Sequence, residues 1–270
     1  MKIAFWSNVR GHSGVTSNLA CISVLSALSC PNERTIVFEN HKNIVNLGST
    51  YYHPQSAGCV REPMYYQTAS GLEKVLQLVE KGEELSEENL YGLTKDYLGK
   101  RLFYLPSEPV KSSDYLEYYL EREAVRTMEC LERLSDMVMV DTSAAPLASS
   151  RKILQQADLV VVNLNQNLPL LSHFFRNYSS IQEKAFYLIG NYDGKSELTK
   201  SAIMKQFHIP GAKIGTIPHD TGFSDAMSRG QLIPFLLKNY MPGNSPSHEM
   251  FMQAVKETVF LLQEQIRQHG

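Results

Sequence analysis

The chain has 270 residues, of which 43% are apolar and 20% charged, and its formal net charge is −2. This composition is ordinary for a folded protein, and the length suffices for one large α/β domain with a buried core. The slight acidity disfavours strong non-specific binding to nucleic acid, which requires a cationic surplus. We expect a single domain over residues 1–270, with an irregular excursion at about residues 48–100.

The cysteines and the apolar runs bear on the cell compartment. The four cysteines have neither CxxC spacing nor histidines at zinc-site spacing, which favours reduced thiols; they are Cys21, Cys30, Cys59 and Cys130. No apolar run approaches the ~20 residues that span a bilayer. The N-terminal MKIAFWSN lacks a signal-peptide pattern. These features predict a cytoplasmic protein.

Short β-rich runs alternate with helical patterns along the chain. Strands are predicted at residues 2–7, 35–39, 101–105, 137–141, 159–163, 185–191 and 213–217. Helices are predicted at residues 14–28, 115–135, 168–180 and 197–207, and Ser86 with Glu88 indicates a further helix start. Continuous apolar runs such as MVMV and LVVV are typical of strands buried on both faces. The pattern predicts a doubly wound α/β fold, with a mostly parallel central sheet of about seven or eight strands flanked by helices.

Residues 10–17, RGHSGVTS, lie between the first predicted strand and the first predicted helix. Glycines there would let the backbone turn and present N–H groups to phosphate oxygens, next to the positive end of the helix dipole. A phosphate-binding loop also carries a lysine that bridges the terminal phosphates, and Val15 stands at that position. A helix N-terminus with glycine turns and no ligand would explain the same residues.

The segment RGHSGVTSNLA resembles the deviant Walker A motif of the ParA/MinD family of P-loop ATPases, (K)GGxGKTTxAxNLA. The matching positions are Arg10, Gly11, His12, Ser13, Gly14, Val15, Thr16 and Ser17. The resemblance implies that these residues bind the nucleotide and that Arg10 takes the place of the signature lysine, which reaches across a dimer. An exposed arginine with no such role is the alternative. His12 and Val15 depart from the family glycine and lysine.

Three later segments resemble family motifs in the same order. MVMVDTSAA is similar to the Walker B strand, which implies that Asp141 and Thr16 hold Mg²⁺. YLIGN resembles the strand ending in an adenine-reading asparagine, here Asn191. IGTIPHDTGFSDAMSRGQ resembles GxIPxDxxxxEAxxxGxP, whose adenine-contacting positions are Ile217, Pro218, His219 and Asp220.

The segment FENHKNIVNL takes the place of the family segment that carries catalytic aspartates. Glu39 keeps a carboxylate at the strand end, and His41 replaces the second aspartate. His41 is either a base or water-positioning group, or an ordinary surface histidine. With Asp141, these two residues form the predicted catalytic set.

The resemblance implies a nucleotide-binding switch that holds ATP or ADP with Mg²⁺. Loss of the lysine at Val15 predicts weak or absent hydrolysis, since such electrostatic stabilisers are worth ~3–4 kcal/mol. A homodimer and a protein partner are expected. The degenerate loop resembles that of CpaE/TadZ-like proteins, which localise pilus-assembly or secretion machines. A plasmid or chromosome partitioning ATPase and a scaffold that binds no nucleotide are the alternatives.

Direct membrane binding and DNA binding are not expected. The C-terminal segment, residues 248–270, has a one-sided apolar stripe, but its polar face mixes acidic with basic residues, which favours packing against the core. Arg122, Arg126 and Arg133 lie among glutamates on one predicted helix, as on a solvated, ion-paired face.

Overall fold

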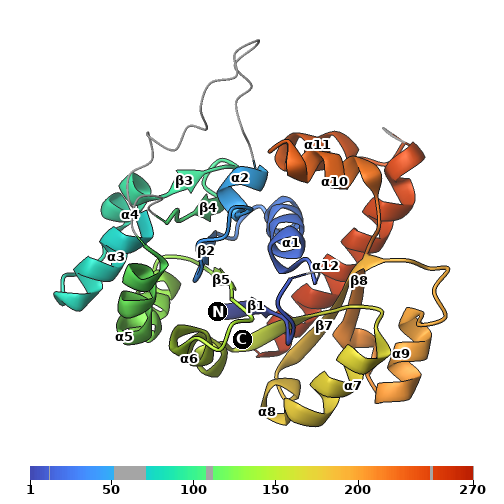
Figure 1. The fold of residues 1–270 in the computed structure, drawn as a ribbon. Helices are drawn as coiled ribbons and strands as arrows, with labels where there is room; N and C mark the ends of the chain where they lie inside the picture. Colours follow the sequence, from blue (N-terminus) through green and yellow to red (C-terminus); the bar gives the residue numbers. More distant parts are fainter. Residues whose placement is uncertain (12, 52–70, 108–111, 244–245, 270) are drawn as a thin grey trace.

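The computed structural model describes residues 1–11, 13–51, 71–107, 112–243 and 246–269. Its strands form one eight-stranded sheet in the order β3-β4-β2-β5-β1-β6-β7-β8 (Figure 1). Seven of the strands are parallel, and only β3 pairs antiparallel with its neighbour β4. The predicted doubly wound α/β fold with seven or eight strands is confirmed. Of the irregular excursion expected at about residues 48–100, residues 52–70 lie outside the described residues, and residues 71–100 contain two helices and a short strand.

The seven predicted strands are all present. The strands are β1 (Lys2–Trp6), β2 (Thr35–Glu39), β3 (Lys95–Asp96), β4 (Leu102–Tyr104), β5 (Met137–Asp141), β6 (Leu159–Leu164), β7 (Ala185–Tyr192) and β8 (Ile214–Pro218). Only β3 was not predicted, because two residues are too few to form a recognisable sequence pattern.

The helices are α1 (Val15–Ser29), α2 (Leu47–Tyr51), α3 (Gly71–Glu80), α4 (Glu87–Leu93), α5 (Ser113–Glu132), α6 (Ala148–Gln156), α7 (Leu168–Asn177), α8 (Ser179–Gln182), α9 (Lys200–Phe207), α10 (Thr221–Ser228), α11 (Leu232–Asn239) and α12 (Glu249–His269). Short 3₁₀ turns lie at Gly211–Lys213 and Pro246–His248. Two predicted helix starts are shifted to where a side chain caps the helix. Ser112 accepts a hydrogen bond from the amide of Tyr115, and Thr199 accepts one from Ala202.

Each face of the sheet is covered by its own apolar core. Helices α3, α5, α6, α7 and α9 pack on one face, and α1, α2, α10, α11 and α12 on the other (Figure 1). Successive strand residues alternate between the two cores: Ala4 faces the first, whereas Ile3 and Phe5 face the second. This burial on both faces explains the uninterrupted apolar runs in the sequence.

The C-terminal helix α12 packs into the second core, as predicted. The apolar stripe Phe251, Met252, Val255, Val259 and Leu262 is buried there. Thr258 fixes the helix to β8, because its hydroxyl accepts from the amide of Thr216 and donates to the carbonyl of Thr216, both at 2.9 Å. Among the described residues, no helix is long and apolar enough to cross a membrane.

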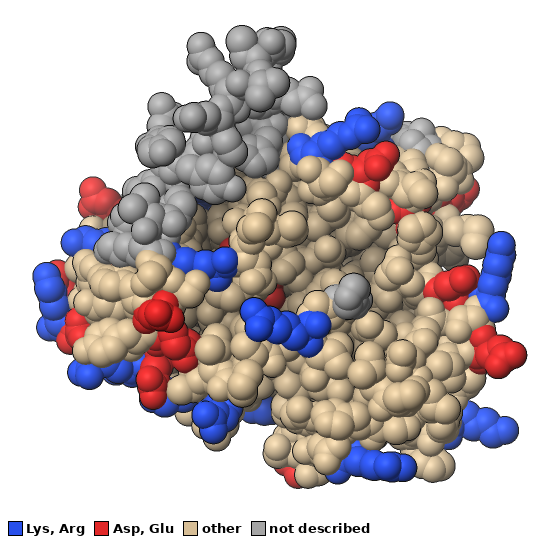
Figure 2. Space-filling view, viewed as in Figure 1, with Lys and Arg blue, Asp and Glu red and all other residues tan. Residues whose placement is uncertain are grey.

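Charged side chains on the visible face are mixed rather than gathered. Figure 2 shows lysines and arginines scattered among aspartates and glutamates, mostly around the periphery of the face. On α5, Arg126 pairs with Glu123 at 3.0 Å, and Arg122 lies 4.0 Å from Glu80 of α3. The arginines of α5 therefore lie on an ion-paired face, as the sequence predicted.

Candidate functional site

The predicted site residues lie at the carboxyl edge of the sheet, where the strand order reverses. Strand β1 lies between β5 and β6, and the chain leaves β1 toward β2 on one side and later reaches β6 on the other. Ligands of open α/β sheets bind outside the carboxyl ends of the strands at such a switch point. The ends of β1, β2 and β5 bring the loop before α1, Glu39 and Asp141 to this place.

The loop after β1 delivers the N-terminus of α1 to that edge. Gly11 and Gly14 both have positive φ, 76° and 65°, a conformation that glycine adopts without strain. Gly14 is the N-cap of α1, and within the described part of the chain no side chain caps this helix end and no acidic residue lies in its first turn. The first amide groups of α1 thus form an electropositive terminus suited to an anion.

The hydroxyl of Thr16 and the carboxylate of Asp141 meet beside this terminus. Thr16 Oγ1 donates a hydrogen bond to Asp141 Oδ2 at 2.5 Å across 125 residues of sequence. Asp141 is almost fully buried, at 1% exposure, because it ends the central strand β5. The structure therefore brings together the two residues that the sequence predicted as metal ligands.

Glu39, His41 and Asp141 form one buried cluster. Glu39 and Asp141 are register partners on the adjacent strands β2 and β5, so their side chains lie on the same face of the sheet. His41 follows Glu39 by two residues, and its Nε2 lies 3.3 Å from Asp141 Oδ1. The side chain of His41 is only 8% exposed, so the interpretation of His41 as an ordinary surface histidine is wrong.

Burial and mutual charge shift the acid–base behaviour of this cluster. Burial raises the pKa of Glu39 to about 7, with a further increase from Asp141 that is opposed by His41 and by two hydrogen bonds. Those bonds come from the amide of Leu47 and the hydroxyl of Tyr104, both at 2.9 Å. Burial would lower the pKa of His41, but its hydrogen bond to Asp141 and the nearby carboxylates outweigh burial and raise it.

An asparagine pair that sequence reasoning did not assign holds the start of α1 against the sheet. Asn18 Nδ2 donates to Asn163 Oδ1 of β6 at 2.8 Å and to the carbonyl of Ser13 at 3.3 Å. Gly190 of β7 makes room for Asn18, since a Cβ at Gly190 would lie 2.4 Å from Asn18 Nδ2. The signal in the sequence was Asn163 itself, a polar residue within the apolar run LVVVNL.

A second polar network fixes the loop that follows Asp141. Asn40 Nδ2 donates to the hydroxyls of Ser149 and Ser150, and Asn40 Oδ1 accepts from the amide of Ser143 at 2.7 Å. Glu117 of α5 accepts from both the amide and the hydroxyl of Ser149. These contacts order the β5–α6 connection next to the cluster, and no pattern in the sequence identifies them.

The predicted adenine-contacting residues lie at the adjacent ends of β7 and β8. His219 Nδ1 lies 2.9 Å from Asn191 Oδ1, and Asn191 has a positive φ of 48°. Pro218 is half-buried at the end of β8, whereas the side chain of Ile217 belongs to the core, which leaves only its backbone for a ligand. Asp220 has structural partners: it caps α10 by accepting from the amide of Phe223 and contacts His248 Nδ1, both at 2.8 Å.

The other loop residues occupy differing environments. Arg10 is exposed, Ser13 is buried, and Val15, Thr16 and Ser17 are half-buried in the first turn of α1. His12 lies outside the described residues. The two carboxylates, the histidine and the threonine thus meet at one point, while Asn191 and His219 lie along the same sheet edge, at the ends of β7 and β8.

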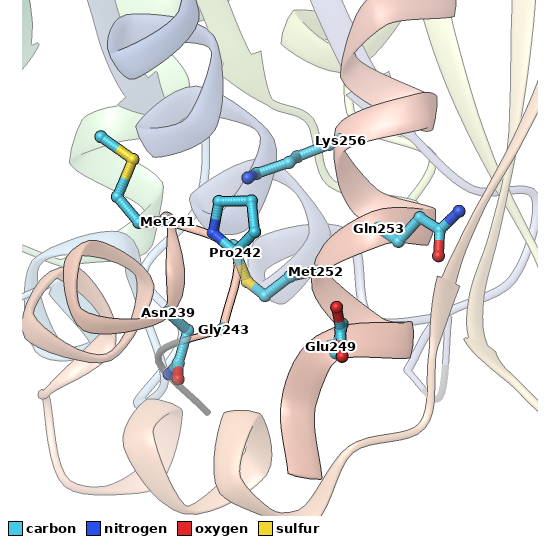
Figure 3. Close-up of a pocket in the computed structure, with 8 residues that line it drawn as sticks. All are labelled: Asn239, Met241, Pro242, Gly243, Glu249, Met252, Gln253 and Lys256. Carbon is cyan, nitrogen blue, oxygen red and sulfur yellow. The ribbon is translucent and has the colours of Figure 1, made fainter. Parts of the chain in front are cut away.

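A separate hollow of about 270 Å³ lies between α12 and the segment after α11 and contains no predicted site residue. Met241, Pro242 and Met252 line it, with Lys256 on one wall (Figure 3). Lys256 donates to the carbonyl of Tyr240 and its Nζ lies 4.4 Å from the centroid of that ring, so its charge already has partners.

No protein-family model and no curated protein sequence matches this chain. Solved structures do. A ParA family ATPase from Chlorobium tepidum TLS matches with a TM-score of 0.70 and 13% identity, over 96% of this chain and 97% of that one. A chain of the MinC:MinD cell division protein complex of Aquifex aeolicus matches with a TM-score of 0.70 and 16% identity, over 97% of this chain and 95% of that one. The septum site-determining protein MinD with Mg-ADP from Pyrococcus horikoshii OT3 has a TM-score of 0.62 and 14% identity, over 98% and 99%.

These likenesses extend over nearly the whole of each chain, and they show that this protein has the fold of ParA- and MinD-type ATPases. At 13–16% identity they show the fold and leave the activity to be argued from the site.

Proposed function

We propose that this chain is an ATP-binding switch of the ParA/MinD type, folded as a single domain over residues 1–270, that positions a partner machine in the cytoplasm and hydrolyses ATP slowly or not at all. The observation that carries the proposal is the uncapped N-terminus of α1 at the switch point of the sheet, with Thr16 hydrogen-bonded to Asp141 beside it. Backbone amides, a helix dipole and a paired hydroxyl and carboxylate form a suitable environment for a phosphate chain with its cation.

The residues beside the helix terminus fit Mg²⁺. The ion prefers oxygen ligands, and Thr16 and Asp141 supply a hydroxyl and a carboxylate. Bound there with the nucleotide, Mg²⁺ would neutralise part of the phosphate charge. The nucleotide itself would lie along the sheet edge from the loop of residues 10–17 toward Asn191 and His219, with Pro218 beside the base. The structure of MinD with Mg-ADP supports this choice of ligand, because that protein has the same fold.

Slow hydrolysis follows from the absence of a lysine charge in the loop of residues 10–17. Val15 leaves no ammonium group at the start of α1, and transition-state stabilisers of that kind are worth ~3–4 kcal/mol each. Arg10 is exposed, so its side chain is accessible to a second copy of the chain. Its guanidinium would form a bidentate contact with the phosphate of a nucleotide bound to that copy. We propose that ATP thereby holds a homodimer together.

The function of such a switch would be to place a partner at a defined site in the cell. The degenerate loop favours localisation of a pilus-assembly or secretion machine, with a plasmid or chromosome partitioning ATPase as the second candidate. The neighbour of known structure that contains MinC and MinD supports a protein partner. Mixed charges on the face in Figure 2 weaken the case for coating DNA, which needs clustered lysines and arginines.

Calorimetric titration of the purified protein with ATP and Mg²⁺, with phosphate release followed in the same sample, tests the proposal. We expect binding with little release. Thr16→Ala should weaken binding about tenfold, since a hydrogen bond to a charged partner is worth about 1.5 kcal/mol. Thr221→Ala, an exposed threonine at the start of α10, is the matched control and should leave binding unchanged.

The possible results separate the three functions. Binding with little release supports the switch. Binding with steady turnover contradicts slow hydrolysis and favours the partitioning ATPase. No binding at millimolar ATP contradicts the switch and favours the scaffold, whose partner would then contact the protein surface.

A further inference from the structure

The cluster at the ends of β2 and β5 has a ligand set that Mg²⁺ alone does not explain. Glu39, His41 and Asp141 offer two carboxylates and one imidazole, and one ligand atom from each lies within 4.8 Å of the others. Mg²⁺ takes oxygen ligands, whereas imidazole together with carboxylate suits divalent first-row transition metals. The chemistry of this set therefore differs from that of the Thr16–Asp141 pair.

We infer that Glu39, His41 and Asp141 form a binding site for a divalent first-row transition metal ion, which the chain binds without nucleotide. The site adjoins the proposed nucleotide site through Asp141 and does not depend on it.

The distances are close to those of a metal centre. Two ligand atoms that each lie about 2.1 Å from a tetrahedral ion are about 3.4 Å apart and cannot be more than about 4.2 Å apart. His41 Nε2 and Asp141 Oδ1 are 3.3 Å apart, already within this range. The ligand atoms all lie within 4.8 Å of one another, so the widest pair closes by at most about 1.4 Å to reach the tetrahedral separation, which a rotation of a side chain supplies.

Burial and hydrogen bonds hold the ligands in place. Each carboxylate oxygen of Glu39 accepts one hydrogen bond, from Leu47 or from Tyr104, and keeps a second lone pair. Thr16 holds the other oxygen of Asp141. Such partners orient metal ligands and tune their basicity.

In the described part of the chain, the second imidazole nitrogen of His41 has no protein partner that dictates which ring nitrogen carries the proton. His41 Nδ1 is buried and has no hydrogen-bond partner among the described residues, although the side chain is more than nine-tenths buried. An ion bound at Nε2 of the neutral ring fixes the tautomer that carries its proton on Nδ1. The protein therefore leaves Nε2 able to act as a metal ligand.

Mn²⁺ alone, added to the full chain without nucleotide, is the probe. Electron spin-echo spectroscopy detects the ¹⁴N of an imidazole bound directly to Mn²⁺. We expect ¹⁴N modulation in the wild type and its loss in His41→Gln. The dissociation constant for Mn²⁺ should rise about a hundredfold in this variant, because losing even a hydrogen-bond partner of a metal ligand weakens metal binding by 10- to 100-fold, roughly. Glu39→Gln should weaken binding but keep the modulation.

His208→Asn is the matched control for adventitious binding at surface histidines. His208 is exposed and has a positive φ of 54°, which asparagine tolerates, and the variant should retain the wild-type signal. The inference is overturned if the wild type shows no ¹⁴N modulation, or if His41→Gln, folded by circular dichroism, keeps it. Because no nucleotide is present, either result is independent of whether the chain binds ATP.

Discussion

Replacing Asn18 with alanine should destabilise the protein and loosen the loop before α1. Asn18 is buried and donates two hydrogen bonds, to Asn163 Oδ1 and to the carbonyl of Ser13. Each bond contributes about 1 kcal/mol net, and leaving the amide oxygen of Asn163 buried without a donor costs a further 1–3 kcal/mol, roughly. Some of that cost is offset if water enters the space, so we expect a loss of about 2–4 kcal/mol in the free energy of unfolding.

Urea denaturation and thermal unfolding measure the change. For a chain of this size, a loss of about 2–4 kcal/mol lowers Tm by roughly 5–10 °C. Asn177→Ala is the matched control: Asn177 is the exposed last residue of α7, and its side chain donates to the carbonyl of His173 on its own helix, so the loss in stability should stay within about 0.5 kcal/mol.

A double-mutant cycle isolates the pair. Asn163→Ala alone removes the acceptor, and the double variant lacks both groups, so the coupling energy reports the Asn18–Asn163 contact itself. We expect a coupling of about 1–2 kcal/mol. A loss below about 1 kcal/mol in Asn18→Ala, or a coupling near zero, would refute the reasoning that this pair fixes α1 to the sheet.

Three further predictions concern the loop, α12 and the N-terminus. Val15→Lys should raise ATP turnover roughly 10- to 1,000-fold by adding the missing charge at the loop, and a folded variant with no increase in phosphate release contradicts the account of slow hydrolysis. Thr258→Val should lower the free energy of unfolding, measured by urea denaturation, by about 2–3 kcal/mol, because the buried amide of Thr216 loses its acceptor. Thr258→Ser keeps the hydroxyl and should retain most of that stability. Equal losses in the two variants would show that the methyl group matters instead. Burial opposes ionisation of Glu132, but hydrogen bonds from Lys2 and the N-terminal ammonium outweigh burial and lower the pKa of Glu132. The ionised Glu132 therefore stabilises the folded protein fully above the ordinary glutamate pKa of about 4.3, and this contribution is lost as the pH falls through the lowered pKa. Glu132→Gln should be less stable than the wild type at pH 7 and equally stable near pH 2, and a difference independent of pH would point to packing.

The strand and helix pattern was predictable because it is local. Apolar runs such as MVMV are long enough to indicate strands buried on both faces, and their alternation with helices implies a parallel sheet. Cap residues were harder to place: Ser86 was recognised, whereas Ser112 and Thr199 were not, because each competes with nearby polar residues for the same role. No local sequence pattern indicates that β3 pairs with β4.

The sequence by itself determined which residue types stand at the ends of β1, β2 and β5, and hence that Thr16 and Asp141 would lie at one edge of the sheet. Only the tertiary structure decided that His41 is buried against Asp141, that Tyr104 bonds to Glu39 and that Asn18 meets Asn163. The physical reason is the same for all three. Contacts between residues on different strands depend on the order and register of those strands, and both are set by the packing of two cores on one sheet rather than by any local stretch of the chain.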